Sequence, residues 1–161
     1  MEIDVGGIVF GDENLCPIYG GRFDGARIHA AKDKCHRVAC NGYTKIAASD
    51  PEYLTARRGS DLYLNIVDAP VTIFRAELFI AALDFIDDAV AAGQLVAIHC
   101  NQGHSRAPSI ALLWKAKRQK TIPDDDYATA RNVFEIIVGP DIYAPGRGIE
   151  TFLGSHWTEI R

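Results

Sequence analysis

Long hydrophobic runs are missing from this chain of 161 residues. No apolar stretch approaches the roughly 18 residues that a membrane-spanning helix needs, so a membrane is not an expected partner. An excess of basic residues is missing as well, because 17 Lys and Arg stand against 21 Asp and Glu, a formal net charge of −4 at pH 7. Nucleic acid binds strongly basic surfaces, and it is therefore not predicted as a partner either.

Signals for export and for a disulfide framework are also absent. The opening MEIDVGGIVF has neither the basic start nor the apolar segment of a secretory signal peptide, which predicts a cytoplasmic location. A reducing compartment keeps thiols free, so the cysteines are candidate nucleophiles or ligands. They are Cys16, Cys35, Cys40 and Cys100. The length fits one domain, residues 1–161, and we expect a monomer.

Short aliphatic runs alternate with helical patterns along the chain. Strands are expected over residues 7–10, 26–30, 61–67 and 94–100, and helices over 75–92, 107–119, 123–137 and 148–160. Residues 31–60 are polar and predict loop with one short helix. The alternation indicates an α/β fold with a central, mostly parallel sheet of four to five strands flanked by helices. Sites in such sheets form at the carboxyl ends of the strands.

The stretch HCNQGHSRAPS, residues 99–109, places reactive side chains between an expected strand and an expected helix. Backbone N–H groups of such a loop form an anion-binding nest, and the helix dipole adds positive charge. Gly103 allows the backbone to turn, and Arg106 supplies a planar fork of donors that fits two phosphate oxygens. The same surroundings stabilise a thiolate, so Cys100 is the candidate nucleophile.

This loop resembles the His-Cys-x5-Arg motif of the protein tyrosine phosphatase superfamily, in the Gly-x-Ser-Arg form of its dual-specificity branch. The matching positions are His99, Cys100, Gly103, Ser105 and Arg106. The segment YAPGRG, residues 143–148, is similar to bacterial and phage members of that branch. The resemblance implies a protein tyrosine phosphatase-like fold and a protein phosphatase that hydrolyses phosphotyrosine through a phosphocysteine intermediate. Phosphoserine and phosphothreonine are further candidate substrates.

The resemblance also assigns roles within the site. Cys100 and Arg106 would be catalytic, His99 would support the thiolate, and a phosphorylated protein or peptide would be the partner. The phosphate loop would consist of Asn101, Gln102, Gly103, His104, Ser105 and Arg106. The resemblance implies no cofactor and no metal.

Asp68 is the candidate general acid, because an alkoxide or phenolate leaving group needs a proton. It follows the expected strand 61–67 in VDAPVT, at the spacing before the cysteine that the family's acid aspartate has. Its alternative role is turn geometry ahead of Pro70. With Cys100 as thiolate and Asp68 protonated, the rate should have a bell-shaped dependence on pH.

The motif departs from its family at Ala107, where most relatives carry Ser or Thr. That hydroxyl assists the cysteine sulfur in the second step, so slow hydrolysis of the phosphoenzyme is expected here. Ser109 lies two residues later and should point elsewhere. The loop has no Lys, which disfavours a phosphoinositide substrate. His104 would add positive charge to the loop when protonated, and a solvent-facing side chain without that role is an equally good interpretation.

His29, Cys35, His36 and Cys40 are close in sequence but lack the paired C-x2-C spacing of many zinc sites, so no metal is predicted there. Cys35 is a candidate for a reversible disulfide with oxidised Cys100, although a free thiol is the simpler interpretation.

Two alternatives to a protein phosphatase remain. Another enzyme could use the same loop, such as an RNA 5′-phosphatase, a phosphoinositide phosphatase or an arsenate reductase. The net charge disfavours RNA, and no resolving cysteine follows Cys100 as a reductase would need. The second alternative is a phosphate-binding module with slow turnover, which only Ala107 favours.

Overall fold

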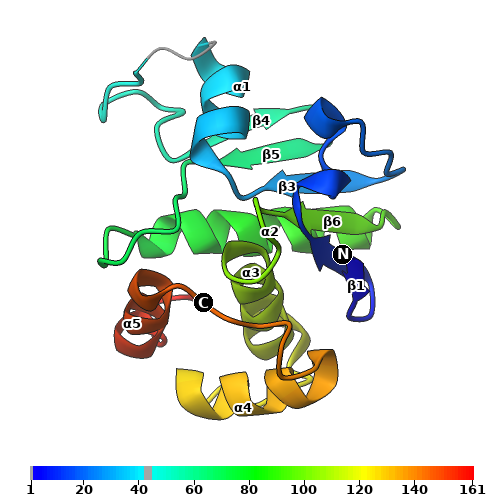
Figure 1. The fold of residues 1–161 in the computed structure, drawn as a ribbon, viewed down its shortest axis with the longest axis vertical. Coiled ribbons are helices and arrows are strands. Elements are labelled where there is room, and N and C mark those ends of the chain that lie inside the picture. Colours follow the sequence, from blue (N-terminus) through cyan, green and yellow to red (C-terminus); the bar gives the residue numbers. More distant parts are fainter. Residues whose placement is uncertain (1, 42–44) are drawn as a thin grey trace.

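A computed structural model of the chain describes residues 2–41 and 45–161, and a six-stranded sheet runs through its centre (Figure 1). The strand order is β1-β2-β6-β3-β5-β4. The strands are β1 (Glu2–Asp4), β2 (Ile8–Gly11), β3 (Ala26–His29), β4 (Thr55–Arg58), β5 (Asp61–Leu64) and β6 (Val96–His99). The inner strands pair in parallel, and β1 and β4 pair antiparallel at the two edges.

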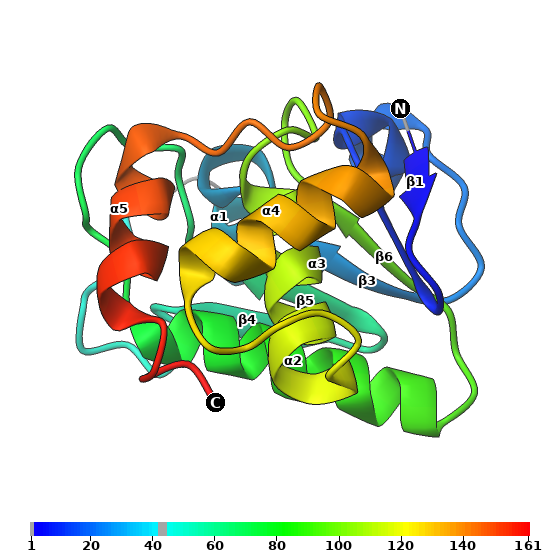
Figure 2. The ribbon, with the colours of Figure 1, turned by 90° about the horizontal axis from the view of Figure 1, so that it is seen from below.

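Within the described ranges, five α-helices and four short 3-10 or π-helical elements surround the sheet. The helices are α1 (Arg37–Asn41), α2 (Ala76–Ala91), α3 (Arg106–Trp114), α4 (Tyr127–Val138) and α5 (Arg147–His156). The short elements are η1 (Glu13–Leu15), η2 (Pro17–Tyr19), η3 (Lys32–His36) and η4 (Lys115–Gln119). Helices α1 and α2 lie on opposite sides of the strands (Figures 1 and 2). Helix α3 packs on β2 and β6, α4 packs on α3, and α5 packs on α4.

The predicted α/β fold with a mostly parallel sheet is confirmed. All four expected strands and all four expected helices are present, with bounds that differ by a few residues. The sequence did not reveal the edge strands β1 and β4. Both are short and carry charged side chains, EID and TARR, so neither forms an apolar run. The short helix expected within residues 31–60 is α1.

Burial follows from this layering. Every residue of β2 and β6 is buried, because helices or turns cover both faces of these inner strands. Apolar residues at helical spacing on α2 pack toward the sheet and are buried: Leu78, Ala82, Phe85, Ile86 and Ala89. Among the described residues, no helix combines the length and the apolar character needed to cross a bilayer. The parallel pairing brings the carboxyl ends of β2, β3, β5 and β6 to one edge of the sheet, where the loops with the candidate residues begin.

Candidate active site

The phosphate loop connects the end of β6 to the start of α3, as the sequence predicts. Cys100 is only 2% exposed, and its backbone N–H donates to the Gly11 carbonyl at 3.2 Å. Gly103 has a φ of 79°, and a Cβ at that position would lie 2.9 Å from the backbone N of Asp12. The loop therefore packs so closely on the end of β2 that glycine is required at its turn.

Arg106 is the first residue of α3 and is 7% exposed. Its Nη1 donates to the Ala30 carbonyl at 3.0 Å, and its Nη2 donates to Asn101 Oδ1 at 2.8 Å. Its Nε is buried and has no hydrogen-bond partner among the described residues. The guanidinium is thus fixed by the protein, while one strong donor stays available for a bound oxyanion.

Asp68 lies in the segment after β5 and reaches the same loop. Ser105 Oγ donates to Asp68 Oδ1 at 3.1 Å, and the backbone N–H of Gly146 donates to Ser105 Oγ at 2.9 Å. These two hydrogen bonds link three segments that are distant in sequence and hold the exposed carboxyl group of Asp68 beside the phosphate loop.

One cavity of about 320 Å³ contains the three candidate catalytic residues. Its lining consists of Asp68, Cys100, Asn101, Gln102, His104, Ser105, Arg106, Ala144 and Gly146. Gly103 and His99 are not part of this lining. Sequence reasoning did not place Ala144 and Gly146 here, although two closely spaced glycines in YAPGRG are a signal for close backbone approach.

Gly146 is expected to be required for the position of Asp68. A Cβ at residue 146 would lie 2.0 Å from Asp68 Oδ1, so Gly146→Ala should push the carboxyl group away from the loop. We expect kcat to fall on the order of tenfold or more for aryl phosphates with poor leaving groups, which depend most on the acid. The matched control is Gly154→Ala in α5, where a Cβ meets no atom within 4 Å and activity should not change. Equal activity of the two variants would contradict this role.

Two further residues of the loop region have defined contacts. Ser109 Oγ donates to the Ser105 carbonyl at 2.7 Å and lies 3.1 Å from Tyr143 Oη, so its hydroxyl is engaged away from the cysteine sulfur. Ala107 is fully buried and offers no hydroxyl in its place. His104 is half-buried, with Nδ1 3.2 Å from the Ile142 carbonyl, which ties the loop to the segment before α5.

His99 lies behind the loop in a buried polar chain. Its Nε2 is 2.8 Å from Nδ1 of His29, whose Nε2 is 2.9 Å from Asp61 Oδ1. Tyr63 stacks on the His29 ring at 4.2 Å between centroids. His99 is thus held by neighbouring strands of the sheet and cannot reach a bound substrate.

The four His and Cys residues that are close in sequence separate into two places. His36 Nε2 donates to the Glu52 carbonyl at 2.8 Å, and Cys40 Sγ lies 3.6 Å from the same ring nitrogen. Burial lowers the pKa of His36. His29 and Cys35 instead lie with Cys16 and His99.

Cys16 Sγ lies 3.9 Å from Cys35 Sγ and 3.7 Å from His29 Nδ1. The hydrogen bond from the Cys35 thiol lowers the pKa of Cys16, and the same contact raises the pKa of Cys35. Cys35 thus contacts the sulfur of Cys16. The disulfide between Cys35 and Cys100 stays a prediction.

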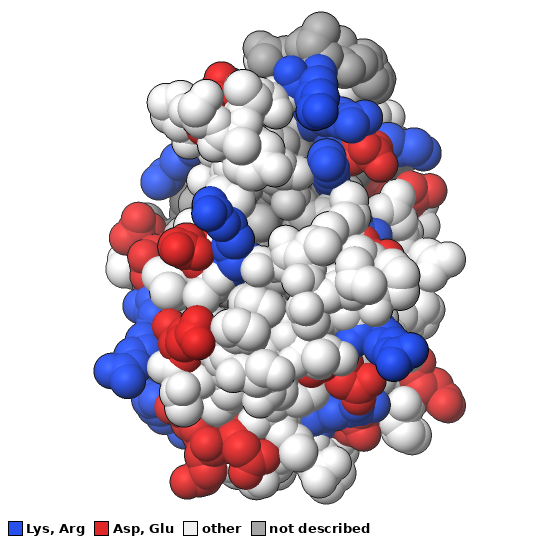
Figure 3. All heavy atoms as spheres, turned by 90° about the vertical axis from the view of Figure 1, so that its left-hand side faces the viewer, with Lys and Arg blue, Asp and Glu red and all other residues white. Residues whose placement is uncertain are grey.

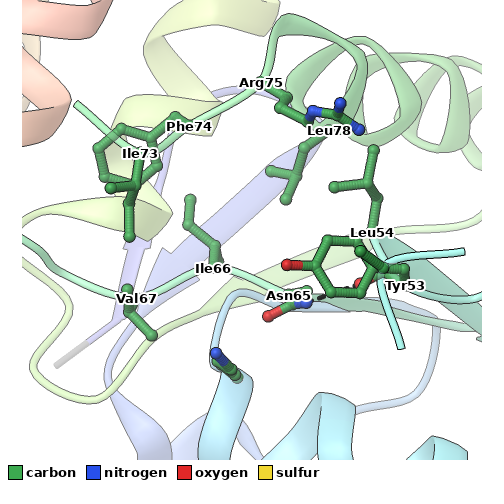
Figure 4. A pocket seen from close by; sticks show the side chains of 11 residues that line it. Tyr53, Leu54, Asn65, Ile66, Val67, Ile73, Phe74, Arg75 and Leu78 are labelled. Carbon is green, nitrogen blue, oxygen red and sulfur yellow. Dashed lines mark hydrogen bonds between the residues drawn. The ribbon is translucent and has the colours of Figure 1, made fainter. Parts of the chain in front are cut away.

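A second cavity, of about 370 Å³, opens beside the segment that leads into Asp68 (Figure 4). Ile66, Val67 and Leu78 supply apolar walls, and Tyr53 and Asn65 are joined by a hydrogen bond from Asn65 Nδ2 to the Tyr53 carbonyl. The lining of this cavity contains no cysteine, so the candidate nucleophile Cys100 lies in the other cavity. The three candidate catalytic residues are all in the cavity around Cys100.

No model of a protein family matches the sequence, and no curated protein matches it significantly. Solved structures do match. The human tyrosine phosphatase-like serine/threonine/tyrosine-interacting protein has 18% identity and a TM-score of 0.65, over 99% of this chain and 96% of that one. Human DUSP28 has 12% identity and a TM-score of 0.62, over 99% and 93% of the two chains.

The Yvh1 phosphatase domain from Chaetomium thermophilum has 15% identity and a TM-score of 0.62, over 98% and 94% of the two chains. At such identities the similarity is one of fold, and it extends over nearly the whole of each chain. The chain therefore has the dual-specificity phosphatase-like fold of the protein tyrosine phosphatase superfamily.

Proposed function

We propose that the chain is a cysteine-dependent protein phosphatase that hydrolyses phosphotyrosine, and also phosphoserine or phosphothreonine. The observation that carries the proposal is the buried Nε donor of Arg106, which has no partner among the described residues and belongs to a side chain in the wall of the Cys100 cavity. A buried charged donor without an acceptor is costly, and a phosphate oxygen would satisfy it.

The residues of the cavity divide the reaction between them. Cys100 Sγ attacks phosphorus in line while Arg106 and the loop N–H groups hold the equatorial oxygens and stabilise their charge. Asp68 gives its proton to the departing oxygen. In the second step Asp68 takes a proton from water, whose oxygen bonds to phosphorus as the S–P bond breaks. The products are inorganic phosphate and the regenerated thiolate.

Protein substrates fit the charge distribution better than RNA does. On the face shown in Figure 3, basic and acidic side chains are interspersed around a largely uncharged centre. The net charge is −4. An RNA 5′-phosphatase would be expected to have a continuous basic path for the nucleic acid backbone.

A rapid-quench measurement on an aryl phosphate at pH 6 tests the proposal. We expect a burst of phenol with an amplitude near one per chain, followed by a slower steady state, because the phosphocysteine forms faster than it breaks down. Comparison of phosphotyrosine and phosphoserine peptides with a 5′-phosphorylated RNA and a phosphoinositide then tests the substrate class. Faster turnover of the RNA or the lipid would refute the assignment to proteins.

Ala107 is expected to make the second step limiting. An Ala107→Ser variant should hydrolyse the phosphoenzyme severalfold faster and raise kcat, while the burst rate stays the same, because the added hydroxyl stabilises the departing thiolate. Single-turnover kinetics separates the two steps. An unchanged kcat would count against this interpretation.

Ala107 also supports a second candidate function, that of a phosphate-binding module with slow turnover. One of the structural neighbours is named as a tyrosine phosphatase-like interacting protein. Binding of a phosphopeptide without any burst of product would favour this second function over the first.

A further inference from the structure

Two cysteines and two histidines meet in the interior behind the phosphate loop. They are Cys16, His29, Cys35 and His99. One possible ligand atom from each lies within 4.8 Å of those from the other three, and every one of the side chains is at most 1% exposed. The proposed catalytic mechanism uses none of the sulfur or nitrogen atoms that converge here.

The sheet itself creates this arrangement. His29 and His99 are register partners on the parallel strands β3 and β6, so their side chains leave the same face of the sheet side by side. Cys16 follows η1, after the end of β2, and Cys35 lies in η3, after the end of β3. Three neighbouring strands thus deliver the four groups to the edge of the sheet at which the phosphate loop starts.

The distances fit a tetrahedral metal. Zn–S bonds of about 2.3 Å and Zn–N bonds of about 2.05 Å at tetrahedral angles place two sulfurs about 3.8 Å apart and a sulfur and a nitrogen about 3.6 Å apart. The Cys16 and Cys35 sulfurs are 3.9 Å apart, and Cys16 Sγ is 3.7 Å from His29 Nδ1. The two ring nitrogens, at 2.8 Å, share a proton that a metal would replace, and they would move apart by about half an ångström.

An outer group already orients one of these ligands. His29 Nε2 lies 2.9 Å from Asp61 Oδ1, which directs Nδ1 toward the two sulfurs. A carboxylate on the second nitrogen of a metal-binding histidine is the usual support of zinc sites, because it sets the tautomer and raises the basicity of the ligand. Asp61 is itself held by Arg27 Nε at 2.9 Å.

We propose that Cys16, His29, Cys35 and His99 bind one Zn²⁺ ion as a structural Cys₂His₂ site beneath the phosphate loop. The two thiols bind as thiolates and release their protons, and each histidine contributes one neutral nitrogen. His99 is bonded to Cys100 through a peptide bond, so the ion would fix the start of the phosphate loop to β3, η1 and η3. The sequence predicts no metal site. Cys16 and His99 are far apart along the chain, so only the fold brings them to His29 and Cys35.

Metal analysis of the full chain purified under reducing conditions tests the site. After incubation with Zn²⁺ and removal of weakly bound ions on a chelating resin, we expect about one zinc per chain. Cys16→Ser and Cys35→Ser should lose it, whereas Cys40→Ser and Cys100→Ser should retain it. The Cys100→Ser variant is included because a zinc ion bound only to the Cys100 thiolate would be lost in it.

Substitution with Co²⁺ gives a second readout that needs no variant to fold. The wild-type chain should show thiolate-to-cobalt charge-transfer absorption and the strong visible bands of a tetrahedral site. Zinc should also raise the Tm of the wild type and not that of a folded Cys16→Ser variant, because a ligand that binds only the native state stabilises it.

The proposal would be overturned by a wild-type chain that is folded but holds no zinc or cobalt, by zinc that persists without Cys16 and Cys35, or by zinc that depends on Cys100. A Cys16–Cys35 disulfide found by mass spectrometry in reduced, zinc-treated protein would also overturn it. None of these readouts requires turnover, so the metal site and the phosphatase activity are tested separately.

Discussion

Cys100→Ser is expected to lower kcat by roughly 10⁴- to 10⁶-fold, the range in which loss of a catalytic nucleophile falls. A serine hydroxyl at this position is neither ionised nor as nucleophilic as a thiolate, so the phosphoenzyme should not form. The burst of phenol expected for the wild type should be absent. Phosphotyrosine peptide binding should persist, because Ala30 and Asn101 still fix the Arg106 side chain, and we expect Arg106 and the loop N–H groups to hold the phosphate without the sulfur.

Cys40→Ser is the matched control for this experiment. Cys40 is partly buried in α1, and its sulfur contacts His36, away from the Cys100 cavity. Its replacement should leave both the burst and the steady state unchanged. A Cys100→Ser variant that keeps more than a small fraction of the wild-type burst would show that another group attacks phosphorus, and the phosphocysteine mechanism would then be wrong.

The second large effect is expected at the general acid. Asp68→Asn should lower kcat on the order of 10² to 10⁴ for phenyl phosphate, whose leaving group needs a proton, and much less for p-nitrophenyl phosphate. Asparagine can still accept the hydrogen bond from Ser105, so the position of the side chain should be retained and only the proton is lost. Steady-state rates over a series of aryl phosphates measure this difference directly.

The dependence of the rate on pH gives the result that would contradict the role of Asp68 as general acid. A general acid must be protonated, so the wild-type rate should fall on the alkaline side as Asp68 loses its proton, and asparagine should remove that fall. Asp88→Asn on the exposed side of α2 is the control and should change neither the leaving-group dependence nor the profile. An alkaline limb that persists in Asp68→Asn would assign the acid to another residue.

The residues of the phosphate loop were predictable because they are local. A buried strand, a short loop and a helix follow one another within residues 94–119, so Cys100 and Arg106 share one cavity whatever the rest of the chain does. Asp68 could be proposed from the same rule, since it follows β5, which is parallel to β6 in the same sheet and ends at the same edge. The helix expected over residues 75–92 is likewise local, and it is present as α2.

The features that depend on distant segments needed the tertiary structure. Ala144 and Gly146 complete the wall of the cavity because the segment before α5 returns across the phosphate loop. The edge strand β4 forms because β5 offers it a partner, although its own sequence has no apolar run.

The buried cluster behind the loop shows most clearly the difference between what the sequence predicts and what only the tertiary structure decides. Sequence proximity grouped His29 and Cys35 with His36 and Cys40. The register of β3 against β6 instead places His29 beside His99, and the segments after β2 and β3 bring Cys16 and Cys35 to them. The sequence by itself determined the candidate phosphate loop, the candidate acid Asp68 and the alternation of strands and helices, because short-range periodicity and turn chemistry encode them. Only the tertiary structure decided which distant side chains share a cavity or a cluster, because strand register and the return of the chain across the sheet arise from long-range packing.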